Sequence, residues 1–102
     1  DEAIQIHKNI LKLKPDYLNS LNSAGYLIAM KNNPTPEEIA EATDFLKEAV
    51  KQNPDSAAYL DSFGVLLNKR GQKQAAIRAF NKAIAANQAH SGIILDHLQS
   101  LL

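Results

Sequence analysis

The stretch DSFGVLLNKRGQKQAAIRAF, residues 61–80, places a glycine in the middle of a sequence that otherwise favours helix. Apolar side chains flank Gly64 at helical spacing, and Gly71 follows Lys69 and Arg70 in the way typical of a helix C-terminus. A glycine inside a helix costs about 1 kcal/mol relative to alanine. Close packing of a second helix against Gly64 would offset this cost. Residues 61–80 therefore predict two helices in close contact, joined at Gly71.

The phrase around Gly64 occurs twice in the chain. The segments LKPDYLNSLNSAGYLI (13–28) and QNPDSAAYLDSFGVLL (52–67) lie 39 residues apart and share a Pro-Asp pair followed by an apolar residue and a glycine. A second, alanine-led phrase occurs as AIQIHKNILKLKP (3–15), ATDFLKEAVKQNP (42–54) and AIRAFNKAIAANQ (76–88). Two alternating helical phrases predict repeated helix pairs. We expect helices at about 2–13, 17–31, 36–52, 56–70, 72–87 and 91–102, with Thr35, Ser56 and Ser91 as N-caps.

These repeats resemble tetratricopeptide repeats (TPR), which are helix-turn-helix units of about 34 residues with a sparse pattern of large, small and aromatic positions. The family's Leu-Gly pair corresponds here to Ala24-Gly25 and Phe63-Gly64. Its alanine and following aromatic correspond to Ala76 and Phe80, and more loosely to Ala42 with Leu46 and Ala3 with His7. The matched signature positions are Ala3, Pro15, Leu21, Gly25, Ala42, Pro54, Leu60, Gly64, Ala76 and Phe80.

The resemblance implies an all-α fold in which antiparallel helix pairs form a right-handed α-solenoid of about six helices. Residues 1–102 would be a single domain. It would comprise the second helix of a truncated repeat (1–15), a repeat with a five-residue insertion near 31–36 (17–54), a complete repeat (56–90) and a C-terminal capping or partial-repeat helix (91–102). Gly64 and Ala76 would remove side-chain bulk where the two helices of the complete repeat cross.

Three departures from the family pattern leave alternatives open. His7 stands where the family has a large apolar ring, and we expect it at the exposed end of the stack. The insertion near 31–36 is either a tolerated surface loop or a partner contact. Leu101 and Leu102 either continue into further repeats or serve self-association.

In TPR proteins the first helix of each pair lines a concave groove that holds a partner. Carried over to this chain, the resemblance implies a partner-binding groove formed by Asn19, Asn22, Ser23, Tyr26, Met30, Ala58, Asp61, Ser62, Val65 and Lys69. Asn19 and Asn22 could hydrogen-bond the backbone of an extended peptide, because an amide side chain both donates and accepts. Tyr26 and Met30 could supply apolar contact.

One branch of the family, the chaperone-binding TPR domains, holds a C-terminal carboxylate with lysine, arginine and asparagine side chains. The positions here that match this clamp carry no cation: Asn22, Ser23, Tyr26, Ala58 and Ser62. Asp61 would also repel an acidic segment. We therefore expect no binding of acidic chaperone tails.

Composition excludes several other classes of function. Eleven basic and eleven acidic residues balance, so no net charge attracts nucleic acid. The chain has no cysteine, which excludes disulfides, zinc-thiolate sites and cysteine nucleophiles. His90 and His97 lack neighbouring ligands, and no catalytic constellation stands out, so we expect neither an enzyme nor a metal or cofactor site. No apolar run approaches the length of a membrane span.

The leading functional hypothesis is a scaffold that binds a partner protein or extended peptide in its groove. The alternatives are a structural module that self-associates through its terminal helices, or a regulatory TPR segment of a larger enzyme or of an envelope or secretion assembly. A soluble chain of this composition fits the cytoplasm and the periplasm equally well.

Overall fold

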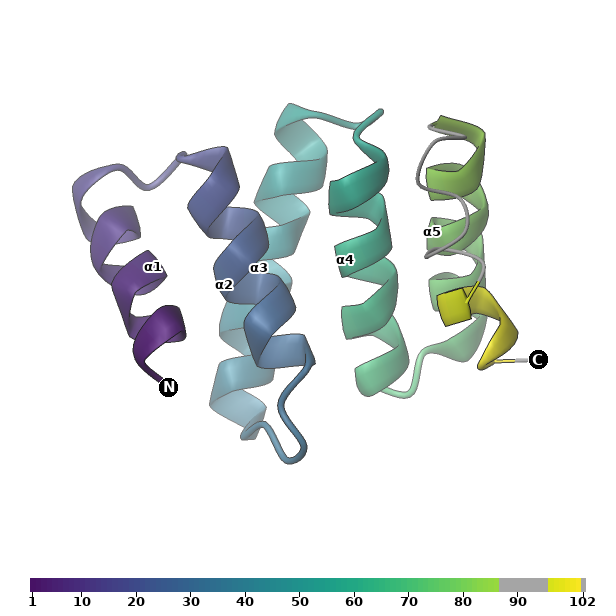
Figure 1. The fold of residues 1–102 in the computed structure, drawn as a ribbon, viewed down its shortest axis with the longest axis horizontal. Coiled ribbons are helices and arrows are strands. Elements are labelled where there is room, and N and C mark those ends of the chain that lie inside the picture. The colour runs from purple at the N-terminus through teal and green to yellow at the C-terminus, as the bar shows by residue number, and fades with distance from the viewer. Residues whose placement is uncertain (87–95, 102) are drawn as a thin grey trace.

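The computed structural model describes residues 1–86 and 96–101, and the regular secondary structure in those residues is helical. The chain folds into α1 (Glu2–Leu13), α2 (Leu18–Ala29), α3 (Pro36–Gln52), α4 (Ala57–Lys69) and α5 (Lys73–Ala86) (Figure 1). A short sixth helix covers residues 96–99. The first five helices end within two residues of the expected bounds. Most of the expected sixth helix, including its N-cap Ser91 and Leu102, lies outside the described residues.

Local capping explains where several helices begin and end. The Thr35 side chain accepts a hydrogen bond from the Glu38 N–H, and Pro36 occupies the first turn of α3. Ser56 caps α4 by accepting from the Tyr59 N–H at 3.3 Å. Both N-caps were expected from the sequence. Gly71 has a φ of 81°, and its N–H donates to the Asn68 carbonyl, so the chain turns out of α4 through a left-handed residue as predicted.

The predicted insertion near 31–36 forms a closed connection between α2 and α3. The Glu38 carboxylate accepts from the Thr35 N–H at 2.9 Å and pairs with the Lys31 ammonium at 2.5 Å. Both hydrogen bonds hold the pKa of the Glu38 carboxyl below its usual value of 4.5, and the bond from Lys31 contributes more than the bond from the Thr35 N–H. The five extra residues are thus tied back to the helix that follows them.

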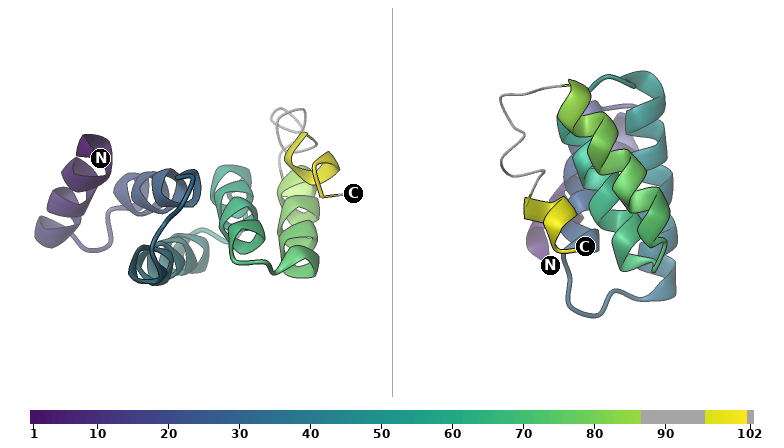
Figure 2. Two further views of the ribbon diagram at one scale, coloured as in Figure 1. Left: turned by 90° about the horizontal axis from the view of Figure 1, so that it is seen from below. Right: turned by 90° about the vertical axis from the view of Figure 1, so that its right-hand side faces the viewer.

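Successive helices run in opposite directions and pack on their neighbours (Figure 1). The helix α2 contacts α1, α3 and α4, while α4 contacts α2, α3 and α5. In Figure 2, α3 lies on the opposite side of the molecule from the short C-terminal helix. The described residues therefore form an all-α domain of packed, adjacent helices. The right-handed solenoid remains a prediction.

Each predicted glycine lies against one large side chain of the following helix. A Cβ added at Gly64 would lie 2.5 Å from Cε1 of Phe80, whose side chain is only 1% exposed. A Cβ at Gly25 would approach the end of the Leu46 side chain to less than 3 Å. The expectation that Gly64 packs closely on the helix carrying Ala76 is thus confirmed, but the nearest side chain is Phe80, one turn further on.

Most of the predicted signature positions are buried. Leu21, Gly25, Ala42, Leu60, Gly64, Ala76 and Phe80 lie in the interior, whereas Pro15 and Pro54 are exposed in the connections. Ala3 is also exposed, although its counterparts Ala42 and Ala76 are fully buried. The difference arises because α2 covers Ala42 and α4 covers Ala76, while no helix of the described chain covers that side of α1.

Candidate partner-binding surface

Five of the expected groove residues form one row on α2. Asn19, Asn22, Ser23, Tyr26 and Met30 recur at the spacing of a single helix face, on the side opposite the fully buried Ile28. Asn19 and Met30 are exposed, and the other three are half-buried. We call these five residues the α2 row. It offers amide, hydroxyl, phenol and thioether groups to solvent from a helix whose other sides are packed.

The other five groove residues form the corresponding row on α4, the helix that packs beside α2. We call Ala58, Asp61, Ser62, Val65 and Lys69 the α4 row. Ala58 and Lys69 are exposed and Val65 is half-buried. Ser62 is only 4% exposed, so its side chain offers almost no surface to a partner.

Asp61 is paired with the C-terminal part of the chain. His97 Nδ1 lies 2.8 Å from Asp61 Oδ1, and the two side chains are 27% and 14% exposed. The sequence analysis did not anticipate this pairing, because His97 lies far along the chain and only the tertiary fold brings it to α4.

Apolar contacts reinforce the position of the C-terminal residues. The His97 ring lies 5.8 Å from the Phe80 ring, and Leu98 packs on the same buried cluster. Leu101 is a buried member of that cluster, which corrects the idea that its side chain is presented for self-association. Leu102 lies outside the described residues. Segment 96–101 therefore borders the α4 row and restricts access to it.

A sequence signal for this contact existed. The segments YLDSFGVLL (59–67) and ILDHLQSLL (94–102) share the Leu-Asp pair and the closing leucines. This likeness could have indicated that the C-terminal segment packs beside α4, much as α4 packs beside α2. The Asp61–His97 pair could not have been inferred from it, because the likeness does not place any two side chains in contact.

Asn22 carries an unsatisfied polar atom. Its side-chain oxygen is buried and has no hydrogen-bond partner among the described residues. A buried oxygen left without a donor destabilises the fold by about 1–3 kcal/mol. Asn22 occupies the place in the α2 row that Asp61 occupies in the α4 row, so the two rows differ in how this position is satisfied.

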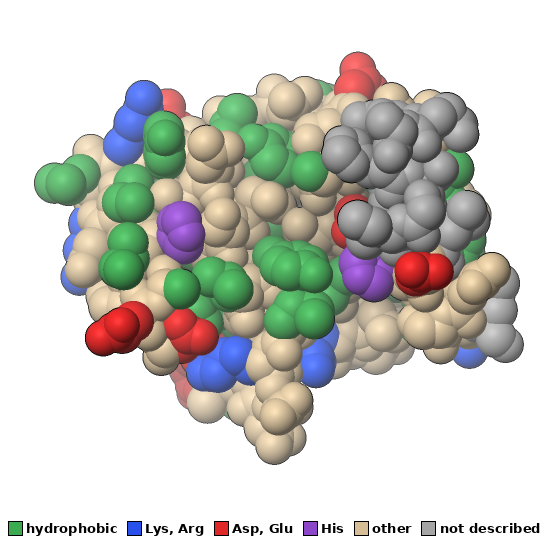
Figure 3. Space-filling model, in the orientation of Figure 1, with side chains coloured by type: hydrophobic (Ala, Val, Ile, Leu, Met, Phe, Trp, Pro, Cys, Tyr) green, Lys and Arg blue, Asp and Glu red, His purple; other side chains and the backbone are tan. Residues whose placement is uncertain are grey.

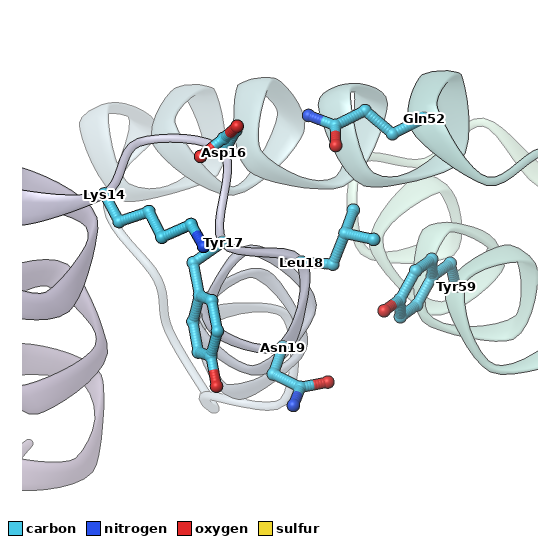
Figure 4. A pocket seen from close by; sticks show the side chains of 7 residues that line it. All are labelled: Lys14, Asp16, Tyr17, Leu18, Asn19, Gln52 and Tyr59. Atoms are coloured by element: carbon cyan, nitrogen blue, oxygen red, sulfur yellow. The ribbon is translucent and has the colours of Figure 1, made fainter.

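A shallow, open hollow of about 370 Å³ adjoins the start of the α2 row. Figure 4 shows the residues that line it: Lys14, Asp16, Tyr17, Leu18, Asn19, Gln52 and Tyr59. Tyr17 and Asn19 project in the same direction from the start of α2, and the Lys14 ammonium lies 5.5 Å from the centre of the Tyr17 ring. Asn19 belongs to both surfaces, so the hollow extends the α2 row. The sequence did not single out Tyr17 or Tyr59.

The face that Figure 3 displays carries apolar side chains over its middle, with basic side chains along its lower edge. Among residues 1–86 and 96–101, no three histidine, cysteine or acidic side chains come together as metal ligands would. Within the same residues, no helix has the length and apolar character needed to cross a membrane. The two rows are suited to noncovalent binding, since they combine apolar area with donors and acceptors.

Comparison of the chain with protein-family models, with curated proteins and with solved structures finds no match in any of the three.

Proposed function

We propose that this protein is a non-catalytic, TPR-like scaffold that binds an extended segment of a partner protein along the α2 and α4 rows. The observation that carries the proposal is the α2 row. Five side chains with mixed apolar and hydrogen-bonding character share one accessible face of a helix whose opposite face is buried. A rigid helix that presents such a row holds its binding groups in fixed positions, which lowers the entropy lost on binding.

The assignment to the TPR family rests on the repeated packing of the helix pairs. Gly25 receives Leu46 in the α2–α3 pair, and Gly64 receives Phe80 in the α4–α5 pair. In both pairs a glycine packs against a large side chain at the matching position, as expected of repeats that stack in the same way. This packing supports a right-handed solenoid in which the α2 and α4 rows share the concave side.

The chemistry of the rows indicates what a partner should offer. Tyr26, Met30 and Val65 suit an apolar side chain of the partner, and the Asn19 amide suits a peptide backbone. Lys69, at the far end of α4, is the one cation among the ten residues of the two rows. The neighbouring Arg70 donates to the Thr43 hydroxyl of α3 at 3.4 Å. An acidic chaperone tail would therefore lack the clamp of several cations that it needs, and we propose that such tails do not bind.

The test is selection of 12-residue peptides from a random phage-displayed library on the full chain, followed by fluorescence titration of the selected peptides. A double variant, Asn19→Ala with Tyr26→Ser, should weaken binding by tenfold or more, since it removes about 1.4 kcal/mol or more of contact. The matched control is Lys47→Ala, an exposed change on α3. Failure to select any peptide, or equal loss in the control, would count against the proposal.

Two further roles stand beside this one. A structural module that self-associates is favoured by the exposed Ile6 and Leu13 on α1, at 57% and 90% exposure. Light scattering of the chain over a range of concentrations tests it, since a monomer throughout excludes it. A regulatory segment of a larger enzyme, or of an envelope or secretion assembly, would use the same rows to hold the rest of that assembly.

A further inference from the structure

The hollow at the start of the α2 row has an aromatic ring on each of two neighbouring helices. Tyr17 directly precedes α2, Tyr59 lies in the first turn of α4, and Leu18 lies between the two rings in Figure 4. Tyr17 is 39% exposed and Tyr59 is half-buried, so both rings offer surface to a ligand. The hollow therefore has two aromatic walls and an aliphatic floor.

Contacts within the chain hold both walls and the floor in position. The Lys14 ammonium lies 5.5 Å from the centre of the Tyr17 ring, a distance at which a cation is attracted to an aromatic face. Leu18 and Tyr59 both pack on the buried cluster that α1, α2 and α3 share. Because the lining side chains are already positioned, they lose little conformational freedom when a ligand binds.

The polar groups that line the hollow indicate what such a ligand should offer. The hydroxyls of Tyr17 and Tyr59 and the amide of Asn19 form no hydrogen bond with any residue that the structure describes. All three can donate to a carbonyl oxygen. Lys14 and Asp16 carry the charges of the lining, and these cancel. The ligand that fits is therefore uncharged, presents carbonyl oxygens and has compact apolar groups that stack on aromatic rings.

We propose that this hollow binds a proline-rich segment of the partner in the polyproline II conformation, with one proline against Tyr17 and another against Tyr59. Such a segment is neutral, its prolines have no N–H that needs an acceptor, and its carbonyl oxygens are free to accept from the phenol and amide groups. Prolines three residues apart lie on the same side, about 9 Å from each other. The axes of packed helices lie about 8–10 Å apart, so rings on α2 and α4 suit this spacing.

This inference rests on the proposed function, since Asn19 belongs to both the hollow and the α2 row, and it names the chemistry of the partner at that end. Two other kinds of segment fit less well. A flexible segment without proline would lose more entropy on binding in a shallow, open hollow and would bring N–H groups that need acceptors. An acidic segment would meet Lys14, but Asp16 offsets that charge.

The experiment titrates the full chain with hexaproline, blocked at both ends so that it carries no charge, and follows amide chemical shifts by NMR. The largest changes should come from residues 17–19 and 59. Tyr17→Ser should weaken binding about fivefold or more, and the fold should tolerate it because this exposed side chain makes no capping hydrogen bond. Tyr59→Phe keeps the packing of the ring and removes the donor, so binding should weaken about twofold or more.

The control variant is Lys47→Ala, an exposed change beside a different hollow, which should leave the affinity for hexaproline unchanged. Absence of binding, shift changes away from the hollow, or equal affinity of the Tyr17→Ser variant would overturn the inference. Tighter binding of blocked hexaglutamate would also overturn it, because the hollow would then select charge. Library peptides that bind the two rows equally well with and without Tyr17→Ser would overturn this inference alone and leave the proposed function standing.

Discussion

The two helix pairs α2–α3 and α4–α5 share their interior and differ at their surface. In both pairs a glycine of the first helix receives a large side chain of the second, and the alanines around that contact are buried. At the matching row position, however, the buried side-chain oxygen of Asn22 has no partner among the described residues, whereas Asp61 is bonded to His97. Repeated packing thus fixes the backbone, while each pair remains free to vary the chemistry of its accessible face.

The largest expected change in stability is at Phe80, the side chain that packs against Gly64. Phe80→Ala should destabilise the fold by about 3–5 kcal/mol, because it empties a fully buried site. Leu46→Ala, the same change in the first pair, should cost about 2–4 kcal/mol, since it removes a smaller side chain. Urea unfolding followed by circular dichroism measures both. A Leu46 variant that unfolds more easily than the Phe80 variant would contradict this order.

Next come the glycines themselves. Gly64→Ala places a Cβ against a ring that is buried and stiff, so we expect a net loss of about 1–2 kcal/mol, even though alanine favours helix by about 1 kcal/mol. Gly25→Ala meets the end of a leucine side chain, which adjusts more easily. The loss there should be smaller. Thermal unfolding of the two variants side by side checks this order. Equal melting temperatures would show that Leu46 and Phe80 accommodate the added methyl group equally well.

A change of opposite sign is expected at the two matching row positions. Asn22→Leu removes a buried oxygen that has no partner and should stabilise the fold by up to about 1 kcal/mol. Asp61→Leu removes a carboxylate that His97 bonds and should destabilise it by about 1 kcal/mol, a modest value because both side chains keep some solvent contact. Destabilisation by both substitutions would mean that Asn22 has a partner in solution.

The smallest expected effect depends on pH and concerns Glu38, which bonds Lys31 and the Thr35 N–H in the connection between α2 and α3. Because its pKa is lowered in the folded state, this carboxylate contributes stability fully above its ordinary pKa of 4.5. That contribution is lost as the pH falls through the lowered value. The difference in urea midpoint between the wild type and Glu38→Gln should therefore be present at pH 7 and shrink by pH 3. Asp44→Asn, an exposed change on the same helix, is the control.

Local signals in the sequence were sufficient to predict where several of the helices begin and end. Thr35 with Glu38, Ser56 and Gly71 each act through neighbours only a few residues away, so their roles follow from the order of the residues. Gly25 and Gly64 were recognised for a related reason. A glycine is unfavourable inside a helix unless another element approaches closely, so its presence already reports a contact.

Long-range pairings were beyond reach of the sequence. Ser62 and Asp61 were both expected to line the groove, but Ser62 is buried and Asp61 is bonded to His97. The hollow between Tyr17 and Tyr59 brings together residues from four helix ends. None of these features leaves a local trace, because each depends on the relative position of elements that are distant along the chain.

The sequence by itself determined the first five helices, the caps at Thr35, Ser56 and Gly71, and the close approach of two helices at Gly64. These features follow from backbone preference and from the 39- and 34-residue repetition of side-chain size. Only the tertiary structure decided which faces stay accessible. The α2 row and the side chains of Ile6 and Leu13 on α1 reach solvent, while segment 96–101 borders the α4 row. The physical reason is that burial depends on what packs against a residue, and the residue's own position in a repeat does not specify its neighbour.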